Sequence, residues 1–250
     1  PAPSFSTKTT RRLAWAPLLV LLPIFGVAHV VYQDGGGDSD SLPLPISPLG
    51  FVAVLAFDEW VNNPDVAREP IEVKTIDSSL DKIVVIMDES VRGDWLDLNI
   101  ANGIPTHLTS QLKRGANFGL AASYANCSAA SNLSFRYAVR RESFLSDIKI
   151  RPSLWALAKH AGYKTIYLDG QRTNRELQNF MTAQELSEID ELVQHDDNTV
   201  AKDKDMVLVT QLQQVLQQKG KAFIYVNKNG VHFPYENKYP ASARLYTPHM

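Results

Sequence analysis

The sequence predicts an α/β domain built on a largely parallel sheet, and the evidence lies in the residues from Lys82 onward. Short apolar runs typical of buried strands occur at Ile83–Met87, Thr165–Leu168 and Ala222–Val226. Stretches with helical spacing alternate with them at His107–Lys113, Leu154–His160 and Asp205–Gln218. This alternation favours parallel strands joined by crossover helices, with functional residues at the carboxyl ends of the strands.

The composition is that of a globular protein long enough to bury one sizeable core. The chain has 250 residues, of which 44% are hydrophobic and 21% are charged. Its formal net charge of -2 gives no electrostatic reason to expect nucleic-acid binding, so we exclude that class. Cys127 is the one cysteine in the sequence, which rules out an internal disulfide and a site made of thiolates.

The N-terminal region contains a candidate membrane span. Leu13–Gln33 carries no Asp, Glu, Lys or Arg over 21 residues, enough for a helix to cross a hydrocarbon core of about 30 Å. Basic residues precede the span and acidic residues follow it, which places the rest of the chain outside the cytoplasm, in a bacterium the periplasm. The alternatives are a buried core helix or a signal peptide, although the apolar run is long for a signal peptide and lacks a clean cleavage site.

We therefore divide the chain into a membrane segment at 1–33, a linker and interfacial segment at 34–80, and a catalytic domain at 81–250. Gly35–Pro48 is rich in Gly, Asp, Ser and Pro, as extended linkers are. Leu49–Phe57 is apolar but too short to cross a bilayer. It either lies on the membrane surface or packs beneath the globular domain.

Two segments of the catalytic domain place chemically useful groups at strand or helix ends. In Ile83–Asp94, IVVIMDESVRGD, a strand runs directly into Asp88 and Glu89, whose carboxylates suit a divalent cation. Ser123–Ser134, SYANCSAASNLS, is a hydroxyl-rich stretch before a helical sequence, where the helix dipole favours an incoming phosphate. Each has an ordinary alternative: acidic loop residues in the first segment, and a serine-rich turn with a helix cap in the second.

A third segment, Phe223–Tyr235, reads FIYVNKNGVHFPY and ends a buried strand in a polar turn that presents His232. This histidine is a candidate zinc ligand or phosphate contact, or else a hydrogen-bonded surface residue. Lys228 and Asn229 stand beside it and could contact phosphate. His160 and His195 are assigned no chemistry.

Read together, the three segments resemble bacterial phosphoethanolamine transferases of the sulfatase-like, alkaline-phosphatase-like superfamily, over about residues 81–240. The first is similar to the family's metal motif, a strand followed by Gly-Glu-Ser or Gly-Glu-Thr and Ala-Arg-Ala-Asp, which implies that Glu89 is a metal ligand. The second resembles Ser-Cys-Gly-Thr-x-Thr, whose nucleophilic threonine stands four residues after the cysteine, the position of Ser131. The third is similar to a Gly-Ser-His-Gly-Pro turn, which implies that His232 lies near the substrate phosphate or a second metal.

The resemblance implies a sulfatase-like, mostly parallel sheet flanked by helices and preceded by a transmembrane helix. It also implies a Zn2+ cofactor bound by Glu89 and Ser131, with Ser131 and His232 as catalytic residues. The expected reaction moves phosphoethanolamine from phosphatidylethanolamine to lipid A or another periplasmic glycan, at the bacterial inner membrane. The alternatives are a sulfatase-like phosphodiesterase, a glycerophosphate transferase and a non-catalytic membrane-anchored relative.

The sequence departs from the family pattern in three places. Asp88 replaces the usual glycine, and Tyr137 stands where the family has a second cysteine. The Asp-His pair that completes the family's zinc site, well downstream of the His-x-Pro turn, is not found before Met250. This implies either truncation or inactivity, and we expect truncation because Pro1 and Met250 both look like arbitrary ends.

Overall fold

The computed structural model describes residues 67–72, 79–232, 235 and 237–243, together with Leu22, Pro23, Gly26 and His29. Apart from these four residues, the predicted span Leu13–Gln33 lies outside the described part of the chain. So do the predicted linker Gly35–Pro48 and the apolar segment Leu49–Phe57. Within the described residues, no helix combines the length and the apolar character needed to cross a bilayer.

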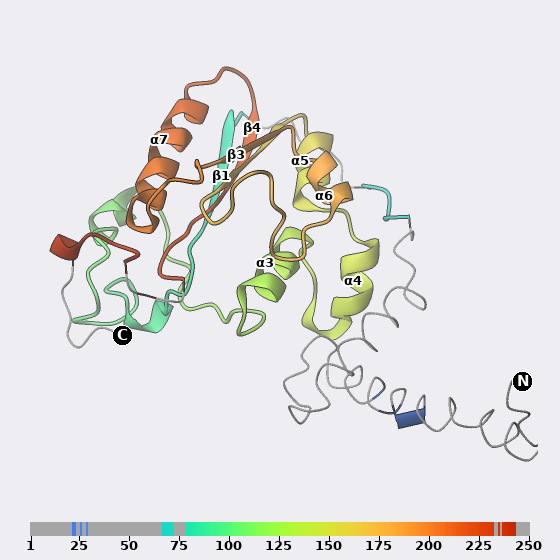
Figure 1. Cartoon of the computed structure of the whole chain (residues 1–250), viewed down its shortest axis with the longest axis horizontal. Coiled ribbons are helices and arrows are strands. Elements are labelled where there is room, and N and C mark those ends of the chain that lie inside the picture. Colours follow the sequence, from blue (N-terminus) through green and yellow to red (C-terminus); the bar gives the residue numbers. More distant parts are fainter. Residues whose placement is uncertain are drawn as a thin grey trace, which may run out of the picture. The chain divides into compact units, whose positions relative to one another are not determined.

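A four-stranded parallel sheet forms the centre of the described fold, as the sequence predicts (Figure 1). Its spatial order is β1 (Lys82–Met87), β4 (Ala222–Asn227), β2 (Lys164–Asp169) and β3 (Glu191–Gln194). In register, Lys82 of β1 and Lys164 of β2 both stand opposite Ala222. The carboxyl ends of the strands therefore meet at one edge of the sheet, where such folds place their functional residues.

The sheet is covered on both faces by helices (Figure 1). The α-helices are α3 (Ser128–Arg136), α4 (Phe144–Ile150), α5 (Leu154–His160), α6 (Ala183–Ser187) and α7 (Lys204–Leu216). Short 3-10 helices occupy Gly93–Trp95, Thr109–Arg114, Arg141–Ser143, Ala201–Asp203 and Ala241–Ala243. The predicted helices at Leu154–His160 and Asp205–Gln218 are confirmed by α5 and α7, but the stretch at His107–Lys113 folds as the 3-10 helix instead of an α-helix.

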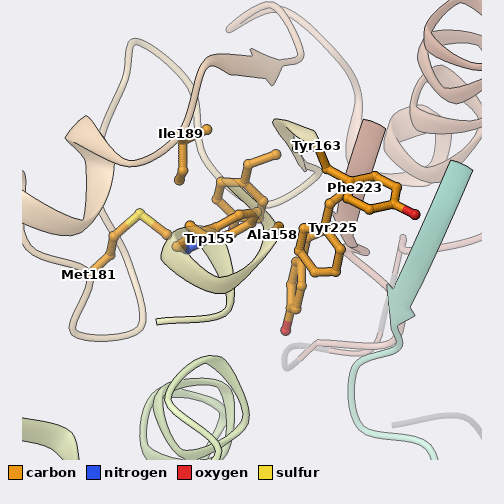
Figure 2. Packing of buried hydrophobic residues seen from close by; sticks show 8 residues of the cluster. Trp155, Ala158, Tyr163, Met181, Ile189, Phe223 and Tyr225 are labelled. Carbon is orange, nitrogen blue, oxygen red and sulfur yellow. The ribbon is translucent and has the colours of Figure 1, made fainter. Parts of the chain in front are cut away.

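The alternation of side chains along β4 builds a core on each face of the sheet. Phe223 and Tyr225 pack with Trp155 of α5, whereas Ile224 and Val226 pack with Leu208 of α7. Figure 2 shows the first of these clusters, in which the fully buried Trp155 ring lies 5.7 Å from Phe223 and 5.6 Å from Tyr225. Such edge-to-face pairs contribute about 0.5–1.5 kcal/mol each beyond the burial of their area.

A buried ion pair joins α3 to α6 beneath this aromatic cluster. The Arg136 Nε donates to Glu185 Oε1 at 2.5 Å, and the two side chains are 2% and 0% exposed. The Trp155 indole N–H donates to the same carboxylate oxygen at 3.0 Å. Since α3 carries residues 128–134 of the hydroxyl-rich segment, this pair fixes that part of the segment to the core.

Strands β1 and β3 differ from what their sequences predict. β1 stands at the end of the strand order with β4 as its neighbour in the sheet, and its Ile86 is 57% exposed, although the apolar run predicts a buried strand. β3 has four residues, Glu191–Gln194, all of intermediate burial, and no apolar run marks it in the sequence. Pairing with β2 creates this strand.

Candidate active site

The carboxylate predicted as a metal ligand lies directly after β1, at the edge where the strands end. Glu89 is partly buried, and its Oε1 accepts hydrogen bonds from the Ser90 and Ser128 hydroxyls, each at 3.1 Å. Its Oε2 accepts from Gln171 Nε2 at 3.4 Å. The donors come from the loop after β1, the first turn of α3 and the loop after β2, so three segments converge on this carboxylate.

The hydroxyl-rich segment leads into α3. The sequence predicts Ser131 as the functional hydroxyl, whereas the hydroxyl that donates a hydrogen bond to Glu89 belongs to Ser128. Cys127 is the N-cap with an extended backbone, and Ser128 is the first helical residue. The Ser131 hydroxyl lies 2.7 Å from Ser123 Oγ and 3.0 Å from the Ala125 carbonyl oxygen. Residues three apart share a helix face, so Ser131 lies about one turn further along α3 on the same face as Ser128.

The third predicted segment packs against the first. The Lys228 main-chain N–H donates to the Met87 carbonyl at 3.0 Å, which continues the pairing of β1 and β4. The Lys228 ammonium lies 2.7 Å from Asp88 Oδ2 and 3.9 Å from Asp205 Oδ2. Asp88, which replaces the family's glycine, therefore has a cationic partner on the neighbouring strand end.

The turn after β4 is held in place by the first turn of α7. Asp205 Oδ1 accepts from the Asn229 N–H at 2.8 Å, and its Oδ2 accepts from the Gly230 N–H at 3.1 Å. His232 follows, exposed, with its main-chain N–H on the Asn229 carbonyl at 3.3 Å. Its predicted contact with a phosphate or second metal stays a prediction.

A buried carboxylate that sequence reasoning missed ties the strand ends together. Asp169, 1% exposed at the end of β2, accepts from Gln178 Nε2 at 2.5 Å and Gln194 Nε2 at 3.1 Å. It also accepts from the Gln171 main-chain N–H at 3.0 Å. Burial raises the pKa of Asp169, and the hydrogen bonds from Gln171 and Gln194 act in the opposite direction.

Gln171, whose side chain contacts Glu89, was also missed by sequence reasoning. The same pattern that revealed Glu89, polar residues directly after a predicted strand, also marks Gln171. Asp169-Gly-Gln171 follows the predicted strand Thr165–Leu168, just as Asp88-Glu89 follows the first strand. Applying the strand-end rule to every strand would have found it.

The described residues do not by themselves assemble a zinc site. A tetrahedral zinc needs four ligands, or three and a water. Glu89 offers a carboxylate and Ser128 a neighbouring hydroxyl, but no group of three or more His, Cys, Asp or Glu side chains within the described residues could hold a metal. Glu89 and Ser131 as metal ligands therefore stay predictions.

At the carboxyl edge of this parallel α/β sheet, a carboxylate thus meets a hydroxyl at a helix N-terminus. The sulfatase family model matches residues 81–250, so the chain belongs to the sulfatase family. This confirms the superfamily predicted from the three segments. The search of curated proteins finds no match.

Solved structures share the fold at low sequence identity. The C-terminal periplasmic domain of EcEptC from Escherichia coli is 19% identical, with a TM-score of 0.52 over 65% of this chain and 46% of that one. Its complex with Zn is 18% identical, again with a TM-score of 0.52, over 65% of this chain and 47% of that one. Lipooligosaccharide phosphoethanolamine transferase A (EptA) from Neisseria meningitidis, an integral membrane protein, is 17% identical, with a TM-score of 0.59 over 99% of this chain and 48% of that one. The chain thus spans less than half the length of these structures.

Proposed function

We propose that this chain belongs to a membrane-anchored periplasmic transferase that moves phosphoethanolamine from phosphatidylethanolamine to lipid A or another glycan acceptor. The observation that carries the proposal is the approach of the α3 N-terminus to Glu89, with Ser128 Oγ 3.1 Å from the carboxylate. Family membership and the fold shared with EptA and the EcEptC domain support the reaction class. The predicted span at Leu13–Gln33 would hold the domain beside lipid substrates.

The reaction is proposed as two displacements at phosphorus. In the first, a serine oxygen on α3 bonds to phosphorus, the bond from phosphorus to the diacylglycerol oxygen breaks, and the serine proton passes to that oxygen. In the second, an acceptor hydroxyl or phosphate oxygen bonds to phosphorus and the bond to serine breaks, which returns a proton to the serine. Ser131 is the proposed nucleophile because it stands at the family's threonine position.

The residues around this serine suit an anionic substrate. The N-terminus of α3 presents unpaired N–H groups and the positive end of the helix dipole to the phosphate. A Zn2+ ion bound by Glu89 and Ser131 would supply Lewis acidity, lowering the pKa of the serine hydroxyl. His232 is proposed to stabilise or protonate the phosphoryl oxygens.

The test compares the full-length protein with Ser131→Ala and Ser128→Ala. Each protein is incubated with Zn2+ and phosphatidylethanolamine that carries a fluorescent acyl chain. We expect fluorescent diacylglycerol and a phosphoethanolamine adduct on the peptide that contains Ser131, both absent from Ser131→Ala. Ser128→Ala should keep the adduct but form it more slowly, because it loses a hydrogen bond to Glu89.

The alternative outcomes each point elsewhere. An adduct on Ser128 that survives in Ser131→Ala would move the nucleophile to the hydroxyl that contacts Glu89. The same assay is run in parallel with phosphatidylglycerol, and release from that lipid alone would favour the glycerophosphate transferase. No release from either lipid by folded, zinc-loaded protein would overturn the transferase proposal and favour the non-catalytic relative.

A further inference from the structure

The carboxylate of Glu89 must present one orientation if it is to serve any catalytic purpose. The last torsion of a glutamate side chain is broad and roughly two-fold, so packing of the stem does not fix the carboxylate plane. Two serine hydroxyls share Oε1, whereas Gln171 Nε2 is the donor to Oε2 at 3.4 Å. A donor on each oxygen is what holds the plane.

Gln171 is itself held at two points. Its main-chain N–H donates to the buried Asp169 at 3.0 Å, and its Nε2 donates to the Lys228 carbonyl at 2.8 Å. A side-chain amide carries two N–H donors, so Nε2 can reach both Lys228 and Glu89. Because both partners are acceptors, the NH2 end of the Gln171 amide faces them.

Gln171 therefore connects the ends of three strands. Asp169 ends β2, Lys228 directly follows β4, and Glu89 stands two residues after β1. Because Asp169 also accepts from Gln178 and Gln194, the base of this connection is buried and rigid. The position of Glu89 is thereby fixed by contacts to several strands of the sheet and not by its own loop alone.

We infer that Gln171 is the positioning residue of Glu89, fixing its carboxylate plane by a hydrogen bond to Oε2. Its consequence for turnover rests on the proposed function, whereas the hydrogen bond itself can be tested without catalysis. Groups that orient a metal ligand, the role proposed for Glu89, change metal affinity or activity by about 10–100-fold when they are removed.

The first experiment observes the side-chain amide of Gln171 by NMR in full-length protein labelled with 15N-glutamine. The resonance that disappears in Gln171→Met identifies the group. We expect this resonance to shift in Glu89→Ala, while the amide of Gln184, exposed on α6, stays unchanged. A Gln171 resonance that does not respond to Glu89→Ala would overturn the inference.

The second experiment measures transfer by Gln171→Met and by the matched control Gln184→Met. We expect kcat of Gln171→Met to fall by about 10-fold or more, with KM and the unfolding midpoint close to those of the wild type. The control should keep both constants. A Gln171→Met enzyme with unchanged kcat, or one whose loss follows only from a lowered unfolding midpoint, would contradict a positioning role.

These two readouts separate the inference from the proposed function. Wild-type protein that transfers nothing would defeat the proposed function, and the NMR result would then decide the role of Gln171 by itself. Transfer by the wild type with no NMR response would defeat the inference and leave the function standing.

Discussion

Replacing Gly230 by alanine should disturb Glu89 through the backbone turn that packs against it. Gly230 has φ +50°, and a Cβ built on it would lie 3.0 Å from Asp88 Oδ1, from Glu89 Cβ and from the Glu89 carbonyl oxygen. Gly220 offers a matched control, since its φ is +90° but a Cβ there meets nothing within 4 Å. Both substitutions place an L-residue at positive φ, and they differ in the contact that the new Cβ makes.

The magnitudes follow from these two terms. The left-handed backbone costs an L-residue about 1–2 kcal/mol, which applies to both variants. Crowding a packed site adds about 1–3 kcal/mol, which applies to Gly230→Ala alone. In a unit of this size each kcal/mol lowers the melting temperature by about 2–4 °C.

Activity should fall together with stability. A displacement of about 1 Å in an active site can cost about 100-fold in rate, so a shift of a few tenths of an ångström at Glu89 should cost roughly 10-fold. Thermal unfolding and the lipid transfer assay on both variants check this. If Gly230→Ala matches Gly220→Ala in both assays, the Gly230 turn does not constrain Glu89.

Two further predictions concern stability. Glu185→Leu leaves the buried guanidinium of Arg136 unpaired and should cost about 3–5 kcal/mol, whereas the double variant with Arg136→Met should recover much of this. Urea unfolding measures both, and a double variant as unstable as the single one would contradict the reasoning. Hydrogen bonds from the side chain and main chain of Arg140 hold the pKa of Asp147 well below its usual range. A depressed pKa gives stability that is present above the unfolded pKa of about 3.9 and is lost as the pH falls below it. The free energy of unfolding of Asp147→Asn should therefore fall less steeply at acid pH than that of the wild type. An acid dependence of the free energy of unfolding that is the same in Asp147→Asn and wild type would contradict this role of Asp147.

The sequence reveals the strands and the three motif segments because their signals are local. The apolar runs at Ile83–Met87 and Ala222–Val226 are strands, and Leu154–His160 is α5 with unchanged bounds. Periodicity and strand-end polar residues depend only on neighbours along the chain. β3 escaped prediction because pairing with β2, not its own composition, makes it a strand.

The sequence did not show which groups contact Glu89 and Asp88. A motif count selects Ser131, yet the first turn of α3 brings Ser128 to the carboxylate across a separation of 39 residues. Gln171 reaches the same carboxylate from 82 residues away, and Lys228 reaches Asp88 from 140.

The sequence by itself thus determined the class of fold and the family, and it predicted Glu89 as the carboxylate of the candidate site. Only the tertiary structure decided which hydroxyl, amide and ammonium groups surround that carboxylate. The physical reason is that a parallel sheet brings strand ends together through long crossovers, and the register between strands selects which side chains meet.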